Sequence, residues 1–329
     1  MKIDFHNHYY PEGYLQALRK ADPTVEVGRD SQGRKIARLF NATVPMLEPA
    51  ERLHEMDRIG VDVQVLSLSA PQVYFAPVQE QLELARQVND AFAQICQEHP
   101  GRFLAFANVP LGDVDKSLKE LDRAIHELKV SGVCLGSNVA GRPLDSPEFF
   151  PFFEEASRLQ VPVYIHPLAP PEAETLGLFQ YNLLALVGFP FETTLAATRM
   201  AYSGLLERLP NLIIILSHLG GALPFLFERI DFGYDEYSAC RDNLSQPPST
   251  YFKRFYYETA LSWGQPALQC ALQPLGASQL LLGSDYPFVP PEMGARSVSA
   301  IEELGLSQSE KEAICYGNAE RILKNAELL

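Results

Sequence analysis

The stretch Leu212-Ile213-Ile214-Ile215-Leu216-Ser217-His218 is a run of apolar, largely β-branched residues that ends in a serine and a histidine. A short run of this kind is typical of a buried β-strand. Seven similar runs lie elsewhere along the chain. Together they predict strands at 2–6, 61–67, 103–110, 130–136, 161–166, 212–218, 255–260 and 279–285.

Longer helical patterns separate these strands. Pro49–Ile59 places Leu53, Met56 and Ile59 on one face at spacings of three, and residues 78–99 form a second amphipathic pattern. Ser146 before Pro147 is a typical helix start, and Ser307 with Glu310 fits a capping box.

The alternation of eight strands with helices predicts parallel βαβ units. We expect these units to close into a single (β/α)8 barrel, a TIM barrel of α/β class, that occupies residues 1–329 as one domain. An open, doubly wound sheet is the alternative. The connections at 10–47, after the first strand, and at 168–192, after the fifth, are too long for simple loops, so each is expected to be a lid or local substructure.

The composition excludes several classes of protein. Lys and Arg number 27 against 41 Asp and Glu, a net charge of −14, and no basic stripe offsets this excess, which argues against nucleic-acid binding. No apolar run approaches the ~20 residues of a membrane helix, and the first residues do not resemble a signal peptide. The five cysteines are scattered without a CxxC pair, which favours neither disulfides nor a cysteine zinc site. We expect a soluble, cytoplasmic protein that does not bind membranes.

Histidines and one aspartate stand at the carboxyl ends of the predicted strands. These groups are His6 and His8 at the first strand, His166 at the fifth, His218 at the sixth and Asp285 at the eighth. In a parallel barrel all these ends lie on one face, where barrel enzymes carry their chemistry. His6 and His8 are two residues apart and so share a face of their strand. Imidazoles with a carboxylate suit a divalent metal of the zinc type and leave a position for water or substrate.

Each group also has a simpler interpretation. A single histidine at a strand end is more often a hydrogen-bonded residue than a ligand, and His54, His99 and His126, which fall in helical patterns, are interpreted in that way. Asp285 could cap a turn, but it follows an apolar run directly. Five such groups at four strand ends favour a metal site.

A second metal ion would need a bridging ligand near the end of the fourth strand. That strand ends without a lysine, Lys129 stands at its beginning, and Cys134 lies in an apolar run that is typical of a core residue. The sequence therefore predicts one metal ion per chain.

The motifs around these residues resemble the amidohydrolase superfamily. They are His6-Asn7-His8, Ile165-His166-Pro167, Ser217-His218-Leu219-Gly220-Gly221 and Gly283-Ser284-Asp285-Tyr286-Pro287, and the resemblance runs in the same order from residue 3 to about 323. It is strongest to the metal-dependent decarboxylase branch, which includes aminocarboxymuconate-semialdehyde decarboxylase and the hydroxybenzoate decarboxylases.

This resemblance implies a metal-dependent carboxy-lyase, or non-oxidative decarboxylase, of a small unsaturated or aromatic carboxylic acid. It implies that His6, His8, His166 and Asp285 hold one divalent ion, usually Zn²⁺ with Mn²⁺ as an alternative, and that His218 is the catalytic acid/base beside Asp285. The alternative is a hydrolase that opens a lactone, amide or ester with metal-bound hydroxide.

The substrate-binding residues are less well defined. The resemblance places Phe40 where aminocarboxymuconate-semialdehyde decarboxylase, the type enzyme of the branch, has an arginine that binds a substrate carboxylate. Arg38 or Arg34 would have to replace that arginine. The resemblance matches Arg229 to a second arginine, which in the dimers of the family serves the neighbouring subunit, so we expect a homodimer. An ordinary ion pair of Arg229 with Asp231 is the alternative. Tyr286 and Phe288, which follow Asp285, are candidates to contact a flat substrate.

Overall fold

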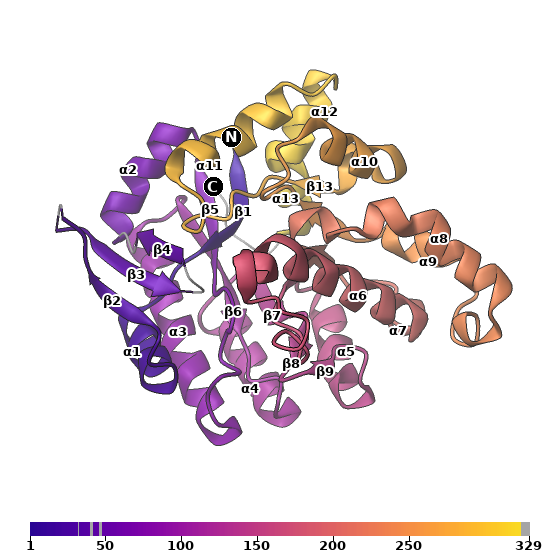
Figure 1. Ribbon diagram of the computed structural model, residues 1–329, viewed down its shortest axis with the longest axis horizontal. Coiled ribbons are helices and arrows are strands. Elements are labelled where there is room, and N and C mark those ends of the chain that lie inside the picture. Colours follow the sequence, from indigo (N-terminus) through magenta and orange to yellow (C-terminus); the bar gives the residue numbers. More distant parts are fainter. Residues whose placement is uncertain (32, 40–41, 46–47, 324–329) are drawn as a thin grey trace.

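The computed structural model describes residues 1–31, 33–39, 42–45 and 48–323. Its central element is an eight-stranded sheet in which each pair of neighbouring strands is parallel (Figure 1). In order around the sheet the strands are β1 (Ile3–His8), β5 (Val63–Ser67), β6 (Phe103–Asn108), β7 (Gly132–Gly136), β10 (Val163–His166), β11 (Ile214–Leu216), β12 (Tyr256–Glu258) and β13 (Leu280–Leu281). All eight predicted strands are present, within a few residues of the expected bounds.

The sheet closes on itself where β13 meets β1. Phe5 N donates to Leu282 O (2.9 Å), Asp285 N donates to His6 O (2.7 Å) and His8 N donates to Tyr286 O (2.7 Å). A parallel bridge between Asn7 and Tyr286 extends this contact beyond the end of β13. These bonds turn the sheet into a barrel, so the predicted fold is confirmed and the open sheet is excluded.

Helices cover the outside of the barrel (Figure 1). The helices that follow the strands are α2 (Pro49–Ile59), α3 (Val78–Glu98), α4 (Val114–His126), α5 (Phe150–Leu159), α6 (Phe189–Tyr202), α8 (Leu223–Glu236), α10 (Gln265–Leu275) and α11 (Pro291–Glu302). Shorter helices are α7 (Leu205–Arg208), α9 (Pro248–Phe252), α12 (Gln308–Glu312) and α13 (Asn318–Ile322). None of the helices within the described ranges is long and apolar enough to span a bilayer.

The two predicted helix starts differ in their details. Ser307 begins α12 with the expected capping box, in which its hydroxyl and Glu310 satisfy each other's backbone N–H groups. Ser146 precedes a short 3-10 turn, η1 (Pro147–Phe149), that leads into α5. Its hydroxyl donates to Pro143 O (2.7 Å) instead of accepting from the helix, so it stabilises the preceding turn.

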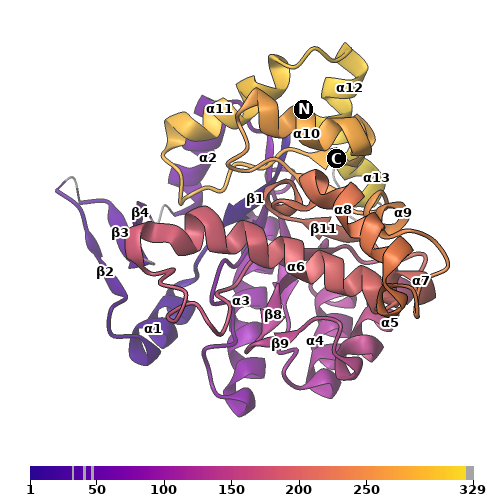
Figure 2. The same ribbon diagram turned by 45° about the vertical axis from the view of Figure 1, so that its right-hand side comes forward.

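Both long connections contain structure of their own, as expected. The first holds α1 (Glu12–Ala21) and an antiparallel sheet of β2 (Glu26–Arg29), β3 (Lys35–Leu39) and β4 (Ala42–Pro45), here called the flap, which projects from one side of the barrel (Figure 1). The second runs through the short helical turns η2 (Gln180–Asn182) and η3 (Leu184–Gly188) into α6, which crosses the outside of the barrel (Figure 2). A small hairpin, β8 (Asn138–Val139) and β9 (Arg142–Pro143), follows β7.

The barrel interior is filled by large side chains from alternate strand positions. They include Phe5, Val65, Phe106, Tyr164 and Ile215, all of which are fully buried. The rings of Phe106 and Tyr164 lie 6.0 Å apart, and the Tyr164 ring lies 5.7 Å from that of His6. This packed layer forms the floor on which the polar groups at the strand ends rest.

Candidate metal centre

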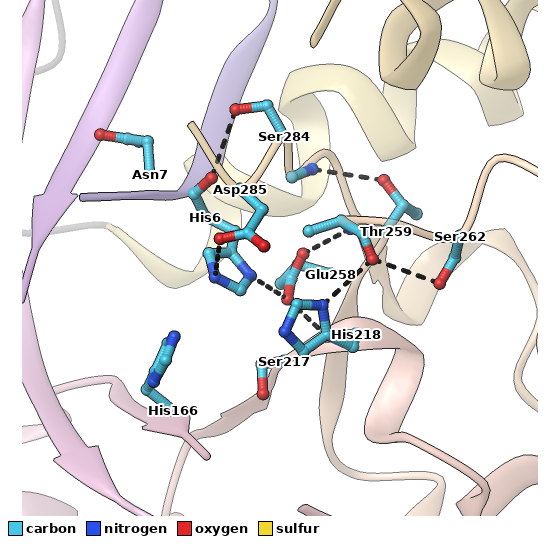
Figure 3. A network of polar contacts seen from close by, with 12 residues as sticks. His6, Asn7, His166, Ser217, His218, Glu258, Thr259, Ser262, Ser284 and Asp285 are labelled. Carbon is cyan, nitrogen blue, oxygen red and sulfur yellow. Dashed lines mark hydrogen bonds and ion pairs between the residues drawn. The ribbon is translucent and has the colours of Figure 1, made fainter. Parts of the chain in front are cut away.

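The five groups singled out at the strand ends come together at one place, as Figure 3 shows for His6, His166, His218 and Asp285. The ligand atoms of His6, His8 and His166 lie within 4.8 Å of one another, and so do those of His6, His218 and Asp285. His6 Nε2 is 3.0 Å from His8 Nε2, and Asp285 Oδ1 is 3.2 Å from His6 Nε2 and 3.5 Å from His8 Nε2. Ligands of one tetrahedral ion are separated by roughly 3.3 Å, given metal–nitrogen bonds of about 2.0–2.1 Å.

Each imidazole uses its Nδ1 to contact a protein oxygen. His6 Nδ1 lies 2.7 Å from Glu258 Oε1, and His8 Nδ1 lies 3.2 Å from Ser67 Oγ. His166 Nδ1 donates to Pro167 O (2.9 Å), and His218 Nδ1 donates to Ala260 O (3.2 Å). Because each Nδ1 is engaged in this way, the Nε2 atoms are left to face the centre. An oxygen partner on the far nitrogen is what orients metal-binding histidines.

Two residues at the centre adopt left-handed backbone conformations that are uncommon outside glycine. Asp285 has φ 64°, and its amide is tied to His6 O, so the turn after β13 aims its carboxylate at the histidines. His218 has φ 52°, and its amide donates to Glu258 Oε1 (2.5 Å). Such conformations persist where the surrounding contacts fix them, and they cluster at functional sites.

Burial and charge act in opposite directions on the buried carboxylates. Burial opposes the ionisation of Asp285, but the charge of His6 and hydrogen bonds from His6 and His8 outweigh it and hold the pKa well below its usual range. Burial likewise opposes the ionisation of Glu258, but the charge and hydrogen bond of His6 lower its pKa on balance. For His6, burial disfavours the charged form, yet Glu258 and Asp285 raise the pKa to about 10.

The other three histidines of the cluster have lowered pKa values, which favours their neutral form. Burial is the main cause in each case: it lowers the pKa of His8 to about 4 and that of His166 well below its usual value. Burial, with the charge of His6, also lowers the pKa of His218. The cluster thus combines two buried, ionised carboxylates, Glu258 and Asp285, with imidazoles that favour the neutral form, and the negative charge of the carboxylates favours a cation between them. This donor set fits a divalent cation.

One residue that the sequence did not single out contributes to the centre. This residue is Glu258, which contacts both His6 and His218 from the end of β12 (Figure 3). The sequence offered a signal, since Glu258 is a charged residue within the strand predicted at 255–260, but it lies two residues before the predicted end, whereas Asp285 ends its predicted strand. Cys134 is fully buried in the barrel interior and is absent from the ligand groups formed by the described residues, as the expectation of a single metal ion requires.

The candidate substrate-binding residues lie in different surroundings. The Phe288 ring is 5.8 Å from that of His8. Tyr286 is buried, and its ring packs against the Arg52 guanidinium at 4.8 Å. Arg229 is exposed on α8, and its side chain has no hydrogen bond or ion pair to any described residue. Asp231, its expected partner, instead accepts a bond from Ser249 N (2.9 Å), so the proposed ion pair of Arg229 with Asp231 is absent.

Two cavities flank the segment before α6. One of about 550 Å³ lies between the flap and residues 178–189, and one of about 370 Å³ lies beside β8 and β9. Pro71, Leu184 and Phe189 line both, and the Phe189 ring is 6.3 Å from that of His166. Arg38 lines the larger cavity, whereas Arg34 pairs with Asp30 (2.7 Å) and lines a separate one. Phe40 lies outside the described residues.

The fold and this cluster define a barrel protein with a candidate metal centre at the carboxyl ends of its strands. The chain belongs to the amidohydrolase family, whose model matches residues 3–324. It is 34% identical over 333 residues to 2-amino-3-carboxymuconate-6-semialdehyde decarboxylase of Dictyostelium discoideum, covering 97% of this chain and 90% of that one. It is 32% identical over 289 residues to gamma-resorcylate decarboxylase of Rhizobium sp., covering 83% and 86%.

One solved structure has a similar fold over the whole length of this chain. The dihydroxybenzoic acid decarboxylase of Polaromonas sp. JS666, with bound manganese and the inhibitor 2-nitroresorcinol, has a TM-score of 0.85 at 27% sequence identity, covering 100% of this chain and 98% of that one. All three of these proteins are decarboxylases. The family resemblance predicted from the strand-end motifs is therefore confirmed.

Proposed function

We propose that this chain is a metal-dependent, non-oxidative decarboxylase of small aromatic or unsaturated carboxylic acids. The observation that carries the proposal is that the ligand atoms of His6, His8 and His166 converge, while Asp285 Oδ1 contacts Nε2 of His6 and of His8. The Nδ1 atoms of the three histidines are held by protein oxygens. These three histidines and Asp285 would hold one divalent ion. We propose Zn²⁺, with Mn²⁺, which is bound in the Polaromonas relative, as the alternative.

When bound, the ion would supply Lewis-acid chemistry to substrate oxygens. The residues of the chain manage the proton. Decarboxylation of an aromatic acid adds a proton to the ring carbon that carries the carboxylate and then breaks the bond to CO2, so that the electron pair of that bond restores the ring. His218 is the proposed acid/base because its Nε2 side faces the cluster while Nδ1 is fixed by Ala260 O, and Asp285 lies beside it.

The cavity beside Phe189 supports a flat substrate with a single carboxylate. Apolar side chains form most of its wall, and its charged side chains are Arg38 and the two acids Asp22 and Glu26. The side chain of Arg38 has no hydrogen bond or ion pair within the described parts of the chain, whereas Arg34 pairs with Asp30, so Arg38 is the better substitute for the missing family arginine. Two acids beside one cation disfavour a dicarboxylate.

A homodimer in which Arg229 serves the neighbouring active site is part of the proposal. Arg229 is exposed on α8 and has no ion-pair partner among the described residues. It lies in sequence between Phe225 and Phe232, which are exposed by 78% and 55%. On the neighbouring α6, Phe191 and Leu195 are also exposed. Apolar patches of this kind mark interaction surfaces. Cytoplasmic location stays a prediction from the sequence.

The function is tested by CO2 release from a panel of hydroxybenzoates and muconate-type acids. Metal-stripped protein should be inactive and should regain activity when Zn²⁺ or Mn²⁺ is added. Hydrolysis of lactones, amides or esters by the same preparation, without CO2 release from any acid, would overturn the assignment in favour of a hydrolase.

A further inference from the structure

The candidate metal ligands lie on both sides of the line where the barrel closes. His6 and His8 belong to β1, and Asp285 follows β13. Regular strand pairing ends at this line, and a few backbone bonds, such as Asp285 N to His6 O, replace it. The distance between the histidines and the carboxylate therefore depends on how firmly the two segments are joined.

Arg52 of α2 contacts both the His6–His8 part of β1 and the segment that carries Asp285. Its side chain is 3% exposed. Its Nη1 donates to His8 O (2.7 Å), its Nη2 donates to Asn7 Oδ1 (2.7 Å), and its Nε donates to Gln64 Oε1 (2.6 Å). The face of the same guanidinium lies 4.8 Å from the centre of the Tyr286 ring, on the far side of the closure. One rigid group thus contacts β1, β5 and the segment that carries Asp285.

The network continues to the turn that precedes Asp285. Gln64 Nε2 donates to Asp4 Oδ2 (3.0 Å). Asp4, which is fully buried, accepts bonds from Ser284 Oγ (2.7 Å) and Ser284 N (3.0 Å). The side-chain amide of Gln64 therefore links Arg52 to Asp4, and Asp4 in turn binds Ser284 on the other side of the closure.

The chemistry of Arg52 indicates a specific role. Burying a guanidinium costs several kcal/mol unless it is well compensated. Among the described residues, no carboxylate lies within ion-pair distance of Arg52, and its three acceptors are neutral oxygens. Arginine presents donors in a fixed planar fork, which suits three acceptors at fixed angles and which lysine cannot reproduce.

We propose that Arg52 is a positioning residue for the metal centre. Arg52 holds the His6–His8 segment and the Asp285 turn at the separation that a single ion requires. The proposal rests on the proposed metal site. Arg52 does not itself face the candidate ligand atoms, since it binds the backbone carbonyl of His8 and not its imidazole.

The test compares metal binding by Arg52→Met, Arg52→Lys and the parent. Metal-free proteins are titrated with Mn²⁺ well below their unfolding temperatures, and Co²⁺ is added separately to record the visible spectrum, which reports coordination geometry. Groups that orient metal ligands typically contribute about 10–100-fold in affinity, so we expect Arg52→Met to weaken Mn²⁺ binding by that factor and to change the Co²⁺ spectrum. Arg52→Lys should not restore either property.

Controls separate this proposal from the metal site itself. Arg58→Lys changes another arginine of the same helix and should bind Mn²⁺ as the parent does. His8→Ala should lose Mn²⁺; if it binds like the parent, the proposed metal site is wrong. Gln64→Met removes one acceptor of Arg52 and provides a milder variant if Arg52→Met does not fold. If His8→Ala loses the metal while every folded Arg52 and Gln64 variant keeps parental affinity and spectrum, the positioning role is overturned.

Discussion

Glu258 and His6 form a fully buried pair in which Oε1 of the carboxylate lies 2.7 Å from Nδ1 of the imidazole. The pair fixes the histidine so that its Nε2 points to the other ligands, and the same oxygen accepts the amide of His218. A carboxylate behind a metal-binding histidine raises the basicity of the ligand. The pair therefore links the candidate ligands to the candidate acid/base.

Replacing this carboxylate should weaken the metal site more than the fold. Glu258→Gln keeps an acceptor for His6 but removes the negative charge, and we expect metal affinity to fall by about 10–100-fold. Titration of the metal-free protein measures the change. Glu120→Gln is the matched control, because Glu120 is another fully buried glutamate that pairs with Arg123 away from the centre. Equal losses in both variants would contradict a specific role for Glu258.

The purified protein should carry about one divalent ion per chain. His6→Ala should abolish this loading, because His6 belongs to both groups of converging ligand atoms. Elemental analysis of parent and variant measures the ratio. His54→Ala, which changes an exposed histidine of α2, should keep full loading. Two tightly bound ions in the parent would overturn the assignment of a single metal ion.

Metal binding should release a proton near neutral pH. In the metal-free protein Glu258 and Asp285 raise the pKa of His6 to about 10, so this group is protonated at pH 8 and must lose its proton to bind an ion. The bound state holds fewer protons, so affinity should rise with pH, by up to about tenfold per unit between pH 7 and 9. His8 and His166 are already neutral there and contribute none.

Calorimetric titrations in two buffers of different ionisation enthalpy count the released protons. Glu258→Gln should release fewer at the same pH, because the His6 imidazole loses the neighbouring charge that raises its pKa. An affinity that is independent of pH across this range would show that metal binding does not displace a proton from His6.

Loss of the His218 imidazole should affect the reaction and spare the metal. His218→Asn is expected to lower kcat by about 10²–10⁴-fold, the usual contribution of a proton-transfer group. Metal content and CO2 release are measured on the same preparation. Parallel loss of metal and activity would make His218 a required ligand instead.

Arg229→Ala should raise KM, because a charge-assisted contact with the substrate carboxylate is lost. Co-expression with His218→Asn should restore activity in hybrid dimers, in which one site has both residues intact. Arg158→Ala, which removes an exposed arginine paired with Glu155 on α5, should be nearly silent. Hybrid dimers verified by mass spectrometry that stay inactive would place Arg229 within its own subunit or in folding.

Local patterns in the sequence were sufficient for much of this molecule. Apolar runs determined the eight strands, and histidine or aspartate at four of their ends marked the candidate centre, because parallel strands of a barrel end on one face. The sequence did not predict that the flap is a sheet, since its strands are short, β2 is largely exposed, and β2 and β3 lack the apolar runs that mark the barrel strands.

Contacts between distant residues needed the tertiary structure. Nothing in the sequence near His6 indicates that Glu258, 252 residues away, holds its Nδ1, or that Arg52 binds the carbonyl of His8. Closure of the barrel creates these pairs, since it brings the ends of β1, β12 and β13 and the inner face of α2 together. A residue's type and its place on a strand can be predicted from local periodicity, but its partner is decided by which segments the closed barrel makes neighbours.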